Sequence, residues 1–294
     1  SFDGFLFLCG GATSVEATPL RSVRHLIYLE LTSGRYPDLI PRLKLAEDIQ
    51  DWFRDGTYKD LVTFEAHLAG LSSVIVLVLE SAGSIAELGS FAVTDAIRER
   101  LLVLIGEVHY EQESFIRLGP IRRLENNSDS SVLVYDWHEA KPMGGFTERP
   151  AMLQAEVRTI VDEIRGFLRP EEGEKVFKFG EPSHVMLLIC ELCDLFGALS
   201  QREIKGYLAR LTSELNPAEI DQYLFLLTKC ELLKIKSKSH GRYYFASDWQ
   251  PRFSFAFTAG DRVERDRTQI DVLKFYDDHE KTRSDVVKRI RRFA

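Results

Sequence analysis

A run of six apolar residues, Val74–Leu79, constrains the fold of this 294-residue chain more than any other feature. The run is continuous and rich in β-branched side chains, a pattern typical of a strand buried on both faces of a parallel sheet. It ends at a turn of small and polar residues, Glu80–Ser84, and a helical pattern follows that turn. The sequence therefore predicts a central strand, a tight turn and a helix N-terminus in direct succession.

The expected turn between this strand and helix is suited to hold an anion. Backbone N–H groups in such a turn and the positive end of the helix dipole attract negative charge. Glu87 lies near the first turn of the expected helix, where the dipole favours the ionised carboxylate that a nucleophile needs. The spacing of Ser84 and Glu87 also matches a capping box, which requires no chemistry. Glu87 is therefore either a nucleophile or a capping residue.

Further buried-strand patterns predict the fold class of the first half of the chain. They occupy residues 5–9, 101–105 and 131–135, and helical patterns at 21–32 and 60–71 lie between strands. Repeated β and α patterns with buried strands indicate a doubly wound α/β fold with a mainly parallel sheet. We expect this domain to span residues 1–150.

Other residues of the first half are candidates for the same site. Cys9, Gly10 and Gly11 end the first expected strand, where glycines let a backbone approach a ligand closely, although a Gly-Gly turn is often only a turn. Glu47 and Asp48 precede a helical pattern and either face the cleft or cap a helix. Arg122 follows a Gly-Pro loop signal and either binds a phosphate or is solvated.

The second half of the chain reads as a helix and linker, residues 151–174, followed by a separate domain at 175–294. Helical patterns at 184–196, 200–211 and 216–233 precede a β-hairpin pattern at 234–245. Ser200 with Glu203 predicts a capping box, and Asn216 before Pro217 predicts a helix start. Three helices and a basic hairpin resemble a winged helix.

The hairpin pattern carries the basic residues that could contact nucleic acid: Lys234, Lys236, Lys238 and Arg242. They could lie on phosphates, with Tyr243 or Tyr244 available to stack on bases. A protein-binding winged helix with a solvated wing explains the same pattern. Residues 1–174 hold 17 basic and 28 acidic residues and residues 175–294 hold 21 and 17, which suggests two modules with different partners.

Composition narrows the setting of the protein. Four cysteines form no disulfide framework in a chain of this size, so we expect a cytoplasmic protein. Cys190 and Cys193 have CxxC spacing without a second pair, and core packing explains them better than a metal. No apolar run approaches the roughly 20 residues of a membrane span, so we expect neither a membrane segment nor a metal site.

The motifs resemble the nucleoside 2-deoxyribosyltransferase superfamily, whose motif Asp-Ser-Gly-Thr-x-x-Glu-x-Gly carries a glutamate that is the glycosyl nucleophile. Gly83, Ser84, Glu87 and Gly89 match this motif. Ser81 stands where the superfamily has Asp, and Glu80 lies one residue earlier. The acid that contacts the base is therefore displaced or absent, which argues against deoxynucleoside base exchange.

The chain resembles one branch more closely, the deoxyribosyltransferase-like effector toxins encoded beside retron reverse transcriptases. The shared segments are the end of the first strand at Cys9-Gly10-Gly11, the Glu80–Phe91 motif and Ser114–Pro120, followed by the winged-helix-like tail. The resemblance implies an antiphage effector held inactive by the reverse transcriptase and its msDNA, a DNA–RNA hybrid. It also implies an N-glycosidase, a homo-oligomer or higher assembly, and no cofactor, with NAD as the substrate.

The chemistry of the leaving group favours NAD. Nicotinamide leaves a cationic bond as a neutral molecule and needs no protonating acid, whereas a purine leaves poorly without one. Glu87 would attack C1′ and water would resolve the glycosyl-enzyme, with Asp48 as the second catalytic carboxylate. Substrate contacts would come from Cys9, Gly10, Gly11, Glu47, Glu80, Ser81, Gly83, Ser84 and Arg122. The alternatives are a nucleoside or deoxynucleotide glycosidase or 2-deoxyribosyltransferase, and a non-catalytic nucleotide sensor.

Overall fold

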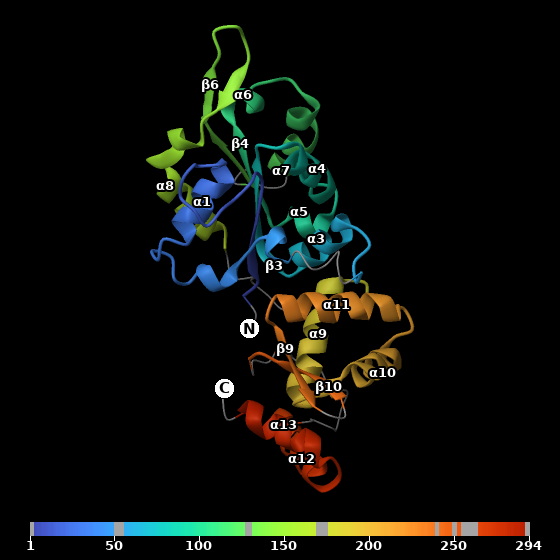
Figure 1. The fold of residues 1–294 in the computed structure, drawn as a ribbon. Coiled ribbons are helices and arrows are strands. Elements are labelled where there is room, and N and C mark those ends of the chain that lie inside the picture. Colours follow the sequence, from blue (N-terminus) through green and yellow to red (C-terminus); the bar gives the residue numbers. More distant parts are fainter. Residues whose placement is uncertain are drawn as a thin grey trace. The chain divides into compact units, whose positions relative to one another are not determined.

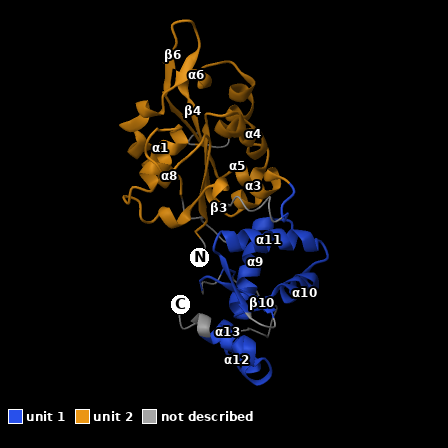
Figure 2. Cartoon of the chain, in the orientation of Figure 1, with its two compact units in different colours: residues 1–2, 51–59, 173–294 blue, residues 3–50, 60–172 orange. Residues whose placement is uncertain are grey.

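The structure is a computed structural model that describes residues 3–49, 56–126, 131–168, 176–238, 241–248, 252–253 and 264–291. The chain divides into two compact units (Figure 2). Residues 3–50 and 60–172 form what we call the α/β unit, and residues 1–2, 51–59 and 173–294 form the C-terminal unit. Segment 51–59 thus belongs to the C-terminal unit although residues of the α/β unit flank it in the sequence.

A five-stranded sheet forms the centre of the α/β unit (Figure 1). Its order is β2-β1-β3-β4-β5, and every neighbouring pair is parallel. All residues of Val74–Leu79 are buried in the middle strand, which confirms the prediction of a buried central strand. The strands are β1 (Phe5–Cys9), β2 (Leu43–Lys44), β3 (Ser72–Leu79), β4 (Leu101–Gly106) and β5 (Val132–Tyr135).

Helices cover both faces of this sheet, with α1 and α8 on one face and α3, α4 and α5 on the other (Figure 1). The apolar side of α8 packs with α1 and the sheet in one core, and α8 is the helix predicted within residues 151–174. The α/β prediction is therefore confirmed for this unit. The helices are α1 (Val23–Leu31), α3 (Leu61–Gly70), α4 (Ala82–Phe91), α5 (Asp95–Arg98) and α8 (Val157–Phe167).

Short elements after β4 complete the α/β unit. The predicted loop at Gly119-Pro120 is wrong, because both residues lie in a π-helical turn, Arg117–Ile121. A π turn accommodates a proline ring that would clash with the carbonyl four residues back in an α-helix. The other elements after β4 are α6 (Glu107–Tyr110), α7 (Arg122–Glu125), β6 (His138–Ala140), β7 (Phe146–Glu148) and a 3-10 turn at Pro150–Gln154. Two earlier 3-10 turns, Ile40–Arg42 and Ala46–Ile49, flank β2.

The C-terminal unit contains a helix, a short strand, two helices and a hairpin, in that order. Its three strands form an antiparallel sheet of order β8-β10-β9. The predicted capping box of Ser200 with Glu203 and the helix start at Asn216-Pro217 are confirmed. The elements are α9 (Pro182–Leu195), β8 (Leu199–Ser200), α10 (Gln201–Leu211), α11 (Pro217–Lys229), β9 (Leu233–Lys238) and β10 (Gly241–Ala246).

Two more helices, α12 (Arg265–His279) and α13 (Lys281–Arg291), follow the hairpin. Tyr276 of α12 and Val287 of α13 pack with Tyr243 of β10 in a small core. The buried carboxylates Glu191 and Asp194 of α9 pair with Arg265, which ties α12 to α9. Along the described part of the chain, no helix has the length and hydropathy to cross a membrane.

The predicted domain boundaries stay a prediction, because a compact unit is not by itself an independently folding domain. The structure does show where individual segments belong. Helix α8, placed in the predicted linker region, is part of the α/β unit. The end of the predicted linker, residues 169–174, and residues 50–55 of the helical pattern expected after Asp48 lie outside the described residues.

Candidate active site

The turn after β3 is organised by two serines. Ser81 is the N-cap of α4, and its Oγ accepts a hydrogen bond from the Ser84 N–H at 3.1 Å. The Ser84 hydroxyl, fully buried, accepts bonds from the N–H groups of Ser81 and Glu80 at 3.0 and 3.2 Å. The capping box therefore joins Ser81 and Ser84, so the alternative in which Ser84 and Glu87 form it is wrong. Glu87 lies in the second turn of α4 and caps nothing.

Glu87 carries a half-buried carboxylate, and one of its two oxygens is without a described partner. Its Oε2 is buried and has no hydrogen-bond partner among the described residues. Burial raises the pKa of Glu87, the charge of Arg24 lowers it and the charge of Glu47 raises it. A buried polar atom without a partner costs about 1–3 kcal/mol, so such atoms concentrate where a ligand or a reaction needs them.

Arg24, at the start of α1, is the cation of the cluster and is almost fully buried. Its Nε and Nη1 donate to the carbonyl oxygens of Leu8 and Gly11, both at 3.0 Å. Its Nη2 donates to Glu47 Oε2 at 2.8 Å. These three bonds fix the guanidinium across the carboxyl end of β1, where it compensates the neighbouring carboxylates.

The two acids of the 3-10 turn after β2 differ in their surroundings. Burial by itself would raise the pKa of Glu47, but the bonds from Arg24 and Thr13 outweigh it and lower that pKa. Asp48 is exposed, and burial of part of its carboxylate and the charge of Glu47 raise its pKa. Glu47 is thus an ionised partner of Arg24, while no described bond joins Asp48 to Glu87.

A residue that the sequence did not single out completes the cluster. Glu65 of α3 is 6% exposed, and burial followed by the charge of Glu87 raises its pKa to about 7. Burial and the charges of Glu87, Glu65 and Glu47 also raise the pKa of the buried Cys9 thiol, so these groups lie around the end of β1. The available signal was an acid on the apolar side of a helix, next to Phe64 and Leu68.

Glu80 has a different task from Glu87, because both of its carboxylate oxygens are taken by backbone groups. Oε1 accepts from the N–H groups of Gly11 and Arg24, each at 3.0 Å, and Oε2 accepts from Val23 at 2.6 Å. Burial raises its pKa although these bonds oppose the shift. Glu80 joins the end of β3 to the loop after β1 and to α1; its predicted substrate contact stays a prediction.

The glycines of the site are placed for different reasons. Gly10 has φ +143, and a Cβ on it would lie 3.0 Å from Val78 Cβ. A Cβ on Gly11 would lie 2.9 Å from Glu80 Oε1, so only glycine fits beside that carboxylate. Gly83 is exposed and has only the Ser81 Oγ near its missing side chain, at 3.7 Å.

The remaining candidates have no hydrogen bond to this cluster in the described structure. Arg122 is exposed on α7, and no described bond joins it to Glu87. Lys234, Lys236 and Arg242 are exposed on the hairpin, whereas the side chain of Lys238 lies outside the described residues. The expectation that Tyr243 or Tyr244 is free to stack is wrong, because both are buried. Strand β10 is central in its sheet, and α12 and α13 cover Tyr243 while α9 packs on β10 as well.

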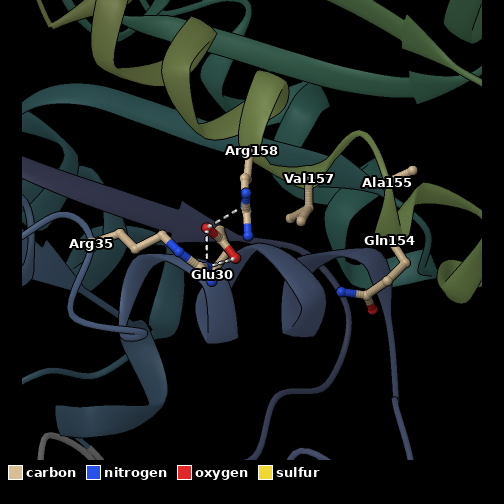
Figure 3. A pocket seen from close by; sticks show the side chains of 6 residues that line it. All are labelled: Glu30, Arg35, Gln154, Ala155, Val157 and Arg158. Carbon is tan, nitrogen blue, oxygen red and sulfur yellow. Dashed lines mark hydrogen bonds and ion pairs between the residues drawn. The ribbon is translucent and has the colours of Figure 1, made fainter.

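A hollow of about 430 Å³ in the α/β unit lies elsewhere (Figure 3). It is lined by Glu30 near the C-terminal end of α1 and by residues at the start of α8. Arg35 donates to both carboxylate oxygens of Glu30 at 2.7 and 2.8 Å, and Arg158 lies 3.8 Å from the same group. Arg24 is at the other end of α1, so this hollow is separate from the Glu87 cluster. No cluster of three metal-binding side chains occurs among the described residues.

The fold and this cluster define an α/β protein with a carboxylate site at the carboxyl edge of a parallel sheet. The chain belongs to the STM3845 retron effector protein family, whose model matches residues 21–235. It is therefore a member of a retron effector family, as the sequence motifs predicted.

Two curated relatives from Escherichia coli are similar to part of the chain. The "Retron Ec86 putative ribosyltransferase/DNA-binding protein" is 32% identical over 139 residues, 47% of this chain and 43% of that protein. The "Retron Ec73 putative ribosyltransferase/DNA-binding protein" is 28% identical over 127 residues, 43% of this chain and 40% of that protein. The matches thus span about two fifths of each curated relative.

Proposed function

We propose that the α/β unit is an N-glycosidase that cleaves the nicotinamide–ribose bond of NAD with Glu87 as the nucleophile. The observation that carries the proposal is the Glu87 carboxylate, which has a buried oxygen without a partner in the described structure. Arg24 and the three carboxylates around it provide a charged, partly desolvated setting at the edge of the sheet. We also propose that the fold of this unit is deoxyribosyltransferase-like, as the motifs predicted.

The proposed reaction has two steps, as in retaining glycosidases. An oxygen of Glu87 attacks C1′ of the ribose, and the bond from C1′ to the nicotinamide nitrogen breaks with its electron pair going to nicotinamide. Nicotinamide leaves as a neutral molecule and an ADP-ribosyl ester of Glu87 remains. Water then attacks C1′, releases ADP-ribose and loses a proton to a nearby carboxylate. Ionised Glu87 is restored.

Glu65 is suited to accept that proton, because its pKa of about 7 lies near neutral pH. The sequence predicted Asp48 for the second catalytic carboxylate, and that role stays open to test because Asp48 is exposed beside Glu47. Substitution of each acid separates the two assignments. Loss of the residue that takes the proton slows the second step, so the glycosyl-enzyme accumulates in that variant.

The arrangement of the turn also supports NAD over purine nucleosides as the substrate. Ser81, at the position of the missing aspartate, uses its hydroxyl to cap α4. Glu80 uses both oxygens for backbone N–H groups. Neither group is free to protonate a purine, whereas nicotinamide needs no proton to leave.

The test uses the purified full chain with NAD and, separately, with deoxynucleotides. Chromatography of released bases and sugars identifies the bond that is cleaved. We expect nicotinamide and ADP-ribose from NAD, and loss of that activity in Glu87→Gln. An unchanged rate in Glu87→Gln would remove Glu87 from the mechanism.

Two alternatives give other outcomes in the same assay. The relatives' names include ribosyltransferase, which favours a nucleoside or deoxynucleotide glycosidase or transferase as the second candidate. Release of free base from deoxynucleotides, with NAD intact, would select it. Tight binding of a nucleotide without turnover would select a sensor.

We further propose that the chain acts in the cytoplasm as a toxic effector held in check by a reverse transcriptase and its msDNA, within a homo-oligomer or higher assembly. The helix–strand–helix–helix–hairpin order of the C-terminal unit supports the predicted winged helix, and its exposed Lys234, Lys236 and Arg242 suit phosphate contacts. Lys238 belongs to the same predicted surface. Co-purification with the reverse transcriptase and msDNA tests the assignment; a chain that never associates with them contradicts it.

A further inference from the structure

Tyr58 is a buried residue that the proposed reaction does not use. It lies in segment 51–59, which belongs to the C-terminal unit, and is 1% exposed. Its hydroxyl donates to the carbonyl oxygen of Gln222 in α11 at 3.2 Å, and the Gln222 side chain donates back to the carbonyl of Thr57 at 3.2 Å. The Tyr58 ring meets Phe225 edge to face, with centroids 6.1 Å apart. Thr57 and Tyr58 are therefore docked on α11.

The docked segment occupies the helix that would read DNA in a winged-helix protein. The equivalent helix of helix-turn-helix proteins presents side chains to the major groove. Here α11 presents Gln222 and Phe225 to Tyr58 instead, and its Asp221 pairs with Lys205 of α10 at 2.5 Å. The surface of α11 thus binds a segment of the same chain.

The same segment leads directly into a helix of the active site. Only Lys59 separates Tyr58 from Asp60, the N-cap of α3, whose carboxylate accepts from the Thr63 N–H at 2.7 Å. Two virtual bonds of 3.8 Å hold the Cα atoms of residues 58 and 60 within about 7.6 Å of each other. The docked tyrosine is therefore two residues from the cap of α3 along the chain.

Helix α3 carries Glu65 five residues after its cap, about 7.5 Å along the helix axis. Phe64 and Leu68 are fully buried and hold the middle of α3 in the α/β unit, whereas Leu61 and Val62 in its first turn are exposed. A displacement of Tyr58 would thus affect the first turn of α3 first. Glu65 lies in the next turn.

We propose that docking of Tyr58 on α11 steadies the chain at the N-terminus of α3, the helix that carries Glu65. Tyr58 is a positioning residue in this account. When Tyr58 leaves α11, the first turn of α3 loosens, and the carboxylate of Glu65 is no longer held in a fixed position relative to that of Glu87. The inference deepens the proposed function and rests on it for the activity readout.

Amide hydrogen exchange of the full chain tests the coupling without any substrate. We expect Tyr58→Ala to speed exchange of the amides of residues 63–66 several-fold, in addition to those of α11. Tyr58→Phe, which keeps the ring, and Gln222→Ala, which removes one hydrogen bond, should have smaller effects in the same place.

Tyr276→Ala is the matched control. Tyr276 is also a buried tyrosine of the C-terminal unit, and its hydroxyl also donates to a backbone carbonyl, that of Phe196, at 3.1 Å. It has no link to α3 along the chain, so its loss should leave the exchange of residues 63–66 unchanged. Equal effects of the two alanine variants on α3, or no effect of Tyr58→Ala on α3, would overturn the coupling.

Turnover supplies the second readout. For the activity that depends on Glu87, we expect Tyr58→Ala to change kcat several-fold with little change in KM, and Tyr58→Phe to restore most of it. Altered α3 exchange in a chain without any Glu87-dependent activity would refute the proposed function and leave the coupling intact. If Tyr58→Ala keeps the Glu87-dependent activity with an unaltered kcat and unaltered α3 exchange, the coupling is refuted and the proposed function stands.

Discussion

Glu80 accepts a hydrogen bond from the backbone N–H of Val23 at 2.6 Å, which joins the end of β3 to the first residue of α1. Two more backbone N–H groups, those of Gly11 and Arg24, bind the same carboxylate. Although Glu80 lies in the motif of the nucleophile, its three bonds to backbone N–H groups organise the edge of the sheet.

The first prediction concerns stability. Glu80→Gln replaces one acceptor oxygen by an NH₂ group that faces backbone N–H donors, so at least one buried donor loses its partner. We expect a loss of about 1–3 kcal/mol in the free energy of unfolding, measured by urea denaturation. Glu87→Gln is the control. Glu87 lies seven residues further along the chain and its Oε2 has no described partner, so this substitution should change the free energy of unfolding much less. An equal loss in both variants would contradict the division of roles.

The second prediction concerns the nucleophile. Glu87→Gln should lower the rate of base release by roughly three orders of magnitude or more, because an amide cannot form the glycosyl ester. Mass spectrometry of the denatured wild-type chain after brief reaction should show an added ADP-ribosyl group, and Glu87→Gln should lack it. A group attached at a different residue would assign the nucleophile elsewhere.

The third prediction concerns Arg24, whose charge lowers the pKa of Glu87 against the effect of burial. Arg24→Met should raise the pKa of the nucleophile, so that the acid limb of the pH–rate profile moves to higher pH by roughly one unit. Arg24→Lys keeps the charge and should move it less, while both variants lose the bonds to Leu8 and Gly11. Identical shifts would show that geometry rather than charge matters.

The fourth prediction concerns stability against pH. The pKa of Glu65 is about 7 in the folded chain, against roughly 4.3 for an exposed glutamate. Between these values the folded chain holds a proton that the unfolded chain has lost, so the contribution of Glu65 to stability falls as pH rises from about 4.3 to 7. The urea concentration at the unfolding midpoint should decline with rising pH over this range, and it should decline less steeply in Glu65→Gln than in the wild-type chain. An unaltered slope would exclude a buried acid at this position.

The fifth prediction concerns the hairpin of the C-terminal unit. Lys234→Glu and Lys236→Glu should each weaken binding to a DNA–RNA hybrid oligonucleotide, and each should reduce the dependence of log Kd on log salt by about one. Lys178→Glu changes an exposed lysine outside the hairpin and serves as the control. Equal weakening by all three would indicate general charge attraction rather than a surface on the wing.

The sequence predicted the strands of the α/β unit well because continuous β-branched runs leave little alternative to a buried parallel strand. It could not assign Glu65, since facing inward depends on how α3 packs, and a lone acid in a helical pattern looks solvated. It misplaced the cap of α4 by three residues because Ser81 and Ser84 are both good caps and only the backbone bonds separate them. Tyr243 looked available because alternation in a hairpin implies an open face, which α12 and α13 cover here.

The docking of Thr57 and Tyr58 on α11 has a consequence for dissection of this chain. A cut near residue 172 leaves Tyr58 on the N-terminal fragment and its partners Gln222 and Phe225 on the other fragment. Neither half is then a faithful copy of its state in the intact protein.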